Sequence, residues 1–155
     1  MSSATRSARY LLKHTDPIAD GDFATAGATL IGNLADGSTT PEPSSEFDTY
    51  MGGKAEVKGT VEHEYRIIGP AEAVIAEIKA AKDANPPTEG YVFIVAHNKQ
   101  SYTQIGPGTF TGAIPIGNKT DRQRAGIKTG FYAEGDTAEE VYKPIEAAVT
   151  LPAAA

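Results

Sequence analysis

The sequence contains no cysteine and no tryptophan. Without cysteine, the chain cannot build a disulfide framework, a thiolate zinc site or an iron–sulfur centre, and it has no cysteine nucleophile. Without tryptophan, one of the side chains that help to form a carbohydrate platform beside a pair of catalytic carboxylates is missing. A cysteine-free chain is compatible with the cytosol and with an extracellular particle, so this absence does not decide the compartment.

Runs of basic residues are also missing. The chain has 14 Lys and Arg against 20 Asp and Glu, a net charge of -6 and a pI of about 5.0. A basic stretch is limited to the short segment 118–124, which is better interpreted as a solvated turn. Because tight binding to nucleic acid rests on cations that neutralise phosphates, we do not expect this protein to grip DNA or RNA.

No stretch approaches the 18 or so apolar residues that cross a bilayer, so we expect no membrane partner. The amino end, MSSATRSARYLLKHTDP, lacks the apolar run of a signal peptide. We therefore expect the protein to be made and kept in the cytoplasm, at least initially.

The length and composition indicate one mainly β domain. A chain of 155 residues is in the usual range for a single core. Its 16 glycines and 10 prolines favour short strands and turns over a helical bundle. The order of elements predicts an α+β domain spanning 1–155, a β-sandwich or barrel-like structure with one amphipathic helix packed on the sheet.

The strongest periodic signal lies in KAEVKGTVEHEYRII, where apolar and polar residues alternate for more than ten positions. This period of two predicts a long strand with one mostly apolar face. The polar face that we predict consists of Glu56, Lys58, Glu62, Glu64 and Arg66.

A helix is predicted directly after Gly69 and Pro70, because Val74, Ile75 and Ile78 recur at intervals of three and four up to the prolines at 86–87. Further strands are predicted at 8–14, 28–34, 91–97, 108–116 and 125–135, of which 91–97 is the most apolar. The glycines of 105–112 are better explained by a tight turn than by a phosphate loop, because the motif lacks the Lys-Ser/Thr pair and leads into a strand.

Three segments are predicted to lie outside the regular core. Residues 1–7 form an amino-terminal arm and residues 136–155 a carboxy-terminal arm, in which Asp136 caps a short helix. Residues 35–53 form a long loop, of a length that usually has a function or is disordered. Near its end, Phe47, Tyr50 and Met51 predict that the loop docks onto something.

The segment VEHEYRIIGP holds the densest group of ionisable side chains, and we considered it as a catalytic or metal site. On a strand, His63 points away from Glu62 and Glu64, so the three cannot converge on one metal ion. The carboxylates share their face with Lys58 and Arg66, which indicates a solvated surface. The other histidines, His14 and His97, form no metal or triad motif with it. We therefore expect no enzyme, no cofactor and no metal.

The order of elements resembles the major tail tube protein family of bacteriophages. The likeness is carried by SARYLLKH, by the loop ADGSTTPEPSSEFDTYMGG leading into KAEVKGTVEHEYRI, by the junction GPAEAVIAEIKAAKDA, and by the strands YVFIVAH, GTFTGAIPIG and AGIKTGFYAEG. It covers most of the chain as a pattern, although no single motif is diagnostic. No long insertion identifies a tail type, and the ending TLPAAA matches no known pattern.

The resemblance implies a structural virion protein that assembles in the host cytoplasm. Members of the family form homohexameric rings that stack into a hollow tube, with other tail proteins such as the tape measure and terminator proteins as partners and DNA only transiently in the lumen. It implies that the polar face of Glu56, Lys58, Glu62, Glu64 and Arg66 lines the channel. It also implies that the loop with Phe47, Tyr50 and Met51 contacts a neighbouring subunit. A capsid decoration protein, a head–tail connector and a small β-sandwich binding module remain alternatives.

Overall fold

A computed structural model describes residues 9–34, 43–68, 72–96, 98–116 and 126–152. The predicted arm at 1–7, the basic segment 118–124 and His97 lie outside the described residues. Tyr50, Glu64 and Arg66 are described as members of strands, but their side chains are not.

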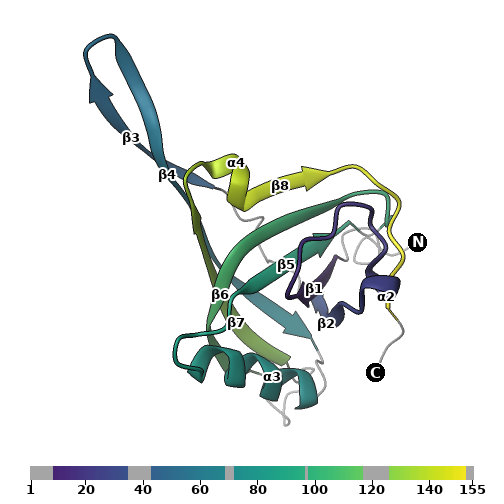
Figure 1. Cartoon of the computed structure of the whole chain (residues 1–155). Coiled ribbons are helices and arrows are strands. Elements are labelled where there is room, and N and C mark those ends of the chain that lie inside the picture. The colour runs from purple at the N-terminus through teal and green to yellow at the C-terminus, as the bar shows by residue number, and fades with distance from the viewer. Residues whose placement is uncertain (1–8, 35–42, 69–71, 97, 117–125, 153–155) are drawn as a thin grey trace.

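The protein is mainly β, as the sequence predicts, with an amphipathic helix packed beside the strands (Figure 1). The elements in chain order are β1 (Tyr10–His14), α2 (Phe23–Ala26), β2 (Thr29–Leu34), β3 (Ser44–Tyr50), β4 (Gly53–Ile68), α3 (Glu72–Asp83), β5 (Gly90–Val95), β6 (Tyr102–Ile116), β7 (Gly126–Gly135), α4 (Ala138–Val141) and β8 (Tyr142–Ile145). The predicted long strand at 54–67 and the helix after Pro70 are thereby confirmed.

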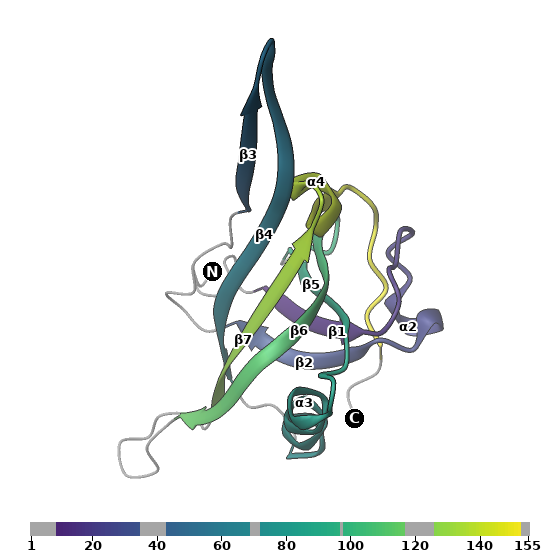
Figure 2. The ribbon, with the colours of Figure 1, turned by 60° about the vertical axis from the view of Figure 1, so that its left-hand side comes forward.

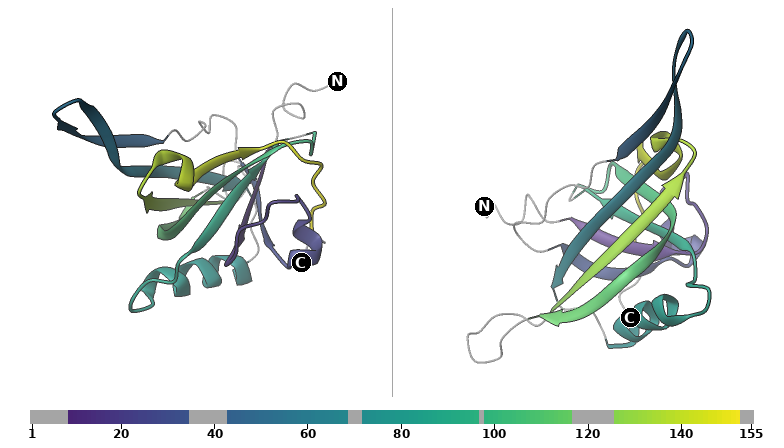
Figure 3. Two further views of the ribbon diagram at one scale, coloured as in Figure 1. Left: turned by 45° about the horizontal axis from the view of Figure 1, so that its top comes forward. Right: turned by 90° about the vertical axis from the view of Figure 1, so that its left-hand side faces the viewer.

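The strands are antiparallel and follow the order β2-β1-β5-β6-β7-β4-β3. A further pairing between β2 and β4, Asn33 with Ile68 and Leu34 with Ile67, joins the two ends of this path. Six strands therefore form a closed ring, with β3 outside it as an extension of β4 and β8 paired to the first part of β6. Figure 3 shows β4, β7 and β6 running side by side across one wall of this ring.

The main core fills the space between the strands and α3. From the helix it receives Val74 and Ile78, which are buried, and Ile75, which is partly buried. The strands contribute buried side chains that include Leu11, Ile31, Val61, Tyr65, Ile67, Val92, Ile105 and Phe131. The apolar side chains that recur at every third or fourth residue of α3 and at every second residue of β4 thus pack together in one interior.

A second core lies on the opposite face of β1 and β5, built around Phe23, Phe93 and Tyr102. The ring of Phe23 stands edge-on to both of the others, with centroids 5.0 Å apart in each case. Because successive side chains of a strand alternate, β5 is buried on both faces through Val92, Phe93, Ile94 and Val95. The prediction of a buried strand at 91–97 is thus confirmed over Gly90–Val95, whose last four residues are buried.

The carboxy-terminal segment belongs to the body of the domain, so the prediction of an arm over 136–155 is wrong for residues 136–152. After β8, the side chains of Ala147, Val149 and Leu151 pack against the second core. The Thr150 N–H donates to the carbonyl of Gly21 at 2.9 Å, and the Ala24 N–H donates to the carbonyl of Thr150 at 3.1 Å. The apolar alternation through 145–151 was the signal in the sequence for this contact.

Three further local predictions are corrected. Residues 44–50 of the predicted loop form β3, because the free edge of β4 supplies partners for their backbone groups. Residues 105–112 form no turn but lie within β6, where Gly108 pairs with both Gly90 and Ala133. The cap of α4 is Thr137, whose hydroxyl accepts from the Glu140 N–H, and not Asp136.

Candidate functional site

The β3–β4 hairpin extends away from the closed ring (Figures 1 and 2). It turns through Met51 and Gly52, and Gly52 and the following Gly53 have positive φ angles of 102° and 154°. β4 begins to pair with β7 only at Gly59, so residues 53–58 pair with β3 alone. This part of β4 has no neighbouring strand on its other edge within the described residues.

Large apolar side chains are exposed on the hairpin, whereas elsewhere they are mostly buried among the side chains that the structure describes. Phe47 is 56% exposed, Met51 100% and Val57 44%, and these are the large exposed apolar residues among the side chains that the structure describes. Scattered exposed apolar residues are ordinary, but a concentration of them marks an interaction surface. Phe47 and Met51 were expected to make such a contact, whereas Val57 was assigned by alternation to the apolar face of its strand.

A β-bulge explains why alternation fails at Val57. Glu46 pairs with Lys58 but Phe47 pairs with Glu56, which leaves Val57 as an extra residue in β4. Ser45, two residues before Phe47 and therefore on the same face, pairs with Gly59. Glu56 thus lies on the inward face with Gly59, opposite to the face of Lys58. The prediction that Glu56 continues the polar face is wrong. Because the bulge adds one residue between Glu56 and Lys58, these two side chains lie on opposite faces of β4.

The contacts of Glu56 agree with this placement. Its carboxylate accepts from the Ser45 hydroxyl at 2.7 Å and from the Ala138 N–H, at the start of α4, at 2.8 Å. These two hydrogen bonds, with the hydroxyl as the larger influence, hold the pKa of Glu56 below its ordinary value. Beside it, Gly59 lies so close to α4 that a Cβ atom there would be 2.1 Å from the Ala138 nitrogen. Glu56 and Gly59 therefore fix the base of the hairpin to α4.

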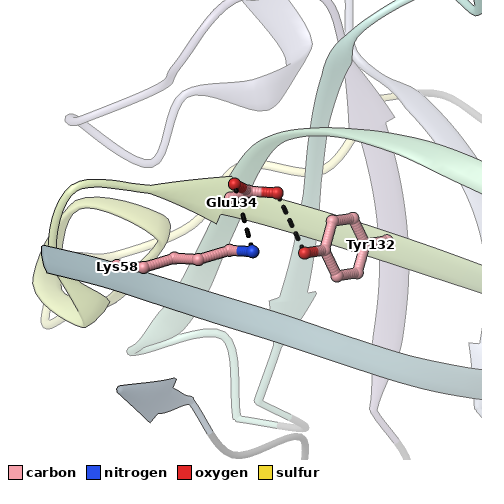
Figure 4. Close-up of polar contacts among 3 residues, drawn as sticks. All are labelled: Lys58, Tyr132 and Glu134. Carbon is pink, nitrogen blue, oxygen red and sulfur yellow. Dashed lines mark hydrogen bonds and ion pairs between the residues drawn. The ribbon is translucent and has the colours of Figure 1, made fainter. Parts of the chain in front are cut away.

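The outward face of β4 and β7 is polar (Figure 4). Glu134 accepts a hydrogen bond from the Tyr132 hydroxyl at 3.0 Å and forms an ion pair with Lys58 at 3.4 Å. The charge of Glu134 raises the pKa of Lys58, and the hydrogen bond to Glu134 raises the pKa of Tyr132. These three side chains form a partly exposed network and not a closed pocket.

Two more carboxylates belong to this face by register. Glu62 pairs with Tyr132, and Glu46 of β3 pairs with Lys58. The described side chains of the face therefore set one cation, Lys58, against the carboxylates of Glu46, Glu62 and Glu134. Glu64 and Arg66 continue β4 opposite Gly130 and Lys128, but their side chains are not described. The described part of the face carries an excess of negative charge.

His63 lies on the other side of the strand. Its ring stands edge-on to the buried ring of Tyr65, with centroids 5.1 Å apart, while Glu62 is exposed. The separation of His63 from Glu62 predicted by alternation is confirmed. Within the described ranges, no group of three or more histidine, aspartate or glutamate side chains is placed to hold a metal ion.

None of the helices in the described ranges has the length and apolar content that crossing a bilayer requires. No protein-family model matches the sequence, and no curated protein is significantly similar to it.

Proposed function

We propose that this protein is a structural virion protein, the subunit of a phage tail tube in which rings of identical copies stack around a channel for DNA. The proposal rests on the β3–β4 hairpin, which extends from the closed ring and holds the large exposed apolar side chains among those that the structure describes. Such a surface favours a role in assembly over a role in chemistry.

The energetics of the hairpin support an assembled state. An isolated two-stranded hairpin is at best marginally stable in water, so an extended one benefits from a partner. β3 is also the edge strand of the described sheet, and Ser44–Tyr50 contains neither the proline nor the lysine that commonly blocks edge pairing. In a monomer such an edge is a liability, whereas in a homo-oligomer it becomes a contact. We therefore propose that Phe47, Tyr50 and Met51 contact a neighbouring subunit.

The polar face supports the second part of the proposal, a channel lining. Lys58 and Glu62 lie on the outward face of the strands with a surplus of carboxylates around them. A surface with net negative charge repels the phosphates of DNA and lets the strand slide. We propose that Lys58, Glu62, Glu64 and Arg66 face the lumen. Glu56 is no longer part of this proposal, because its carboxylate is bound to α4.

Electron microscopy of the purified protein, together with sedimentation at rising concentration, tests the proposal. Rings or tubes with an open lumen are the expected result, and a strict monomer at high concentration would overturn it. If the protein does not assemble alone but binds to the surface of added capsids, it would be a decoration protein. The double variant Phe47→Ser, Met51→Ser should stay folded but lose assembly. The matched control is Ala24→Ser, an exposed position on α2, which should assemble normally.

A further inference from the structure

A pocket lies beside the carboxyl end of α3, where the segment that follows the helix meets the end of β1 and the start of β2. Its volume is about 240 Å³, several times the roughly 30 Å³ that one water molecule takes up in the liquid. The less exposed part of its lining combines apolar side chains with those of Lys13, His14 and Thr29, and the exposed part is mostly polar. The apolar side chains of the first part include Ala81, Tyr91 and Phe110, and the second part includes Thr15, Thr88 and Glu89.

This pocket and the tip of the hairpin belong to opposite ends of the molecule. Figure 2 shows the hairpin extending from one end of the domain and α3 at the other. A contact between two different surfaces of the same chain is heterologous, so each copy that accepts a tip still offers its own. A contact of this kind propagates from copy to copy and generates a stack, whereas a contact between identical surfaces ends at a dimer.

The two surfaces match in size and character. Met51 is fully exposed at the turn, with no side chains on Gly52 and Gly53 to widen the tip. A narrow apolar knob of this kind suits a pocket that is lined by Ala81, Tyr91 and Phe110.

Charge favours the same pairing. Lys54 follows the turn directly and is exposed, and Glu89 is exposed at the pocket. Neither forms an ion pair with any residue that the structure describes, whereas Lys13, also at the pocket, is already paired with Glu77 at 3.2 Å. A single uncompensated cation on the tip and a single uncompensated carboxylate at the pocket are complementary.

We infer that the Met51 tip of one copy inserts into the α3 pocket of the next copy, with Lys54 facing Glu89. The inference rests on the proposed function, because it names the two surfaces by which successive rings of the tube contact each other. The partner is a second copy of this chain, and the contact runs head to tail.

Cysteine cross-linking tests this pairing, and the absence of native cysteine makes the result unambiguous. The double variant Met51→Cys, Thr88→Cys is oxidised under assembly conditions and run on a non-reducing gel. A ladder of multimers that collapses on reduction is expected, because each copy then bonds to the copies before and after it. Each single variant should stay monomeric on the gel, because a head-to-tail contact brings no two identical positions together; dimers in either single variant would mean that the ladder can arise from homotypic bonds. The control pair is Met51→Cys, Glu139→Cys, since Glu139 is exposed on α4, which lies at the opposite end of the domain from α3 (Figure 2), and it should give no ladder.

Charge reversal supplies a second readout. Lys54→Glu or Glu89→Lys alone should raise the critical concentration for polymerisation about tenfold, as expected for a lost interfacial charge pair. The double reversal should restore the wild-type value. Failure of the double variant to recover would argue against a direct contact between these residues.

The outcomes separate the inference from the proposed function. If the wild type forms rings or tubes but the 51–88 pair gives no ladder, or the 51–139 pair gives an equal one, the docking site is wrong and the tail tube assignment stands. If the wild type is monomeric at every concentration and the 51–88 pair gives no ladder, both are overturned.

Discussion

The closed ring of strands and the β3–β4 hairpin differ in how far they bury their large apolar side chains. In the ring, apolar residues of β1 and β5 are buried on both faces, against α3 on one side and against the carboxy-terminal segment on the other. On the hairpin, Phe47, Met51 and Val57 are left exposed. Among the described residues, the ring thus buries its apolar side chains against its own elements, whereas the hairpin leaves these three side chains uncovered.

The comparison is tested most strongly by removing one phenylalanine from each region. Phe93→Ala should lower the free energy of unfolding by about 4 kcal/mol, because it empties a buried aromatic site of the second core. Phe47→Ala should change the stability of the monomer by less than about 0.5 kcal/mol, as is usual for exposed sites. Denaturant unfolding at low protein concentration measures both. A large loss of stability in Phe47→Ala would show that the hairpin packs on its own body.

The contact that holds the base of the hairpin to α4, made by Glu56 and Gly59, is tested at Gly59. Gly59→Ala should destabilise the monomer by about 2 kcal/mol, because the new Cβ would meet the backbone of Thr137 and Ala138. Thermal unfolding followed by circular dichroism gives the measurement. The control is Thr60→Ala, a neighbour on the outward face, for which a clearly smaller loss is expected. Equal losses would mean that α4 is not held against β4.

Inside the ring, Tyr65 is the one described side chain whose buried polar atom has no hydrogen-bond partner among the described residues. Burial also raises the pKa of this hydroxyl. Removing the group in Tyr65→Phe should stabilise the protein by about 1 kcal/mol, since an unsatisfied polar atom is costly to bury. Unfolding in urea checks the sign. A loss of stability instead would reveal a partner for the hydroxyl.

The carboxylate of Glu56 makes the stability of the contact between the hairpin and α4 depend on pH. Because the folded pKa of Glu56 lies below the ordinary 4.5, the stabilisation is complete above pH 4.5 and is lost as the pH falls through the folded pKa. The stability gap between wild type and Glu56→Ala should therefore be full at neutral pH and shrink in acid. Ser45→Ala, which removes one donor to the same carboxylate, should show a smaller gap. A gap that is unchanged at low pH would contradict the hydrogen-bonded arrangement.

The smallest effect on stability is expected on the polar face. Glu62→Lys should leave folding and assembly unchanged, because the side chain is exposed. In an assembled tail it should slow the passage of DNA, since a lysine in the lumen would attract phosphates. Ejection of DNA from virions that carry the variant is the measurement, and Glu62→Gln is the control for charge. Loss of assembly in Glu62→Lys would place this face in a contact between subunits.

Much of the ring follows from local patterns in the sequence. The period of two in β4, the period of three and four in α3 and the apolar run of β5 each predicted an element that the structure contains. These patterns are reliable because an element that packs on the core buries one face or both. On a strand the buried face returns at every second residue, and on a helix at every third or fourth.

The hairpin could not be predicted in the same way. Ser44–Tyr50 has little apolar content, and only its pairing to the free edge of β4 makes it a strand. Alternation failed at Val57 because a bulge adds one residue, and nothing in the composition marks the position of that bulge. The candidate site was thus partly found, through Phe47 and Met51, while the roles of Val57 and Glu56 emerged only from the register of the two strands.

β4 runs unbroken for 16 residues, about 54 Å when each residue advances a strand by roughly 3.4 Å. One end of it lies at the tip of the hairpin, and the other, Ile67 and Ile68, forms the pairs with β2 that close the ring. A force applied to the tip is therefore transmitted along one continuous backbone to the β2–β4 pairs that close the ring, past the bulge at Val57. A neighbour that grips the tip would thereby pull on the closure of the ring itself.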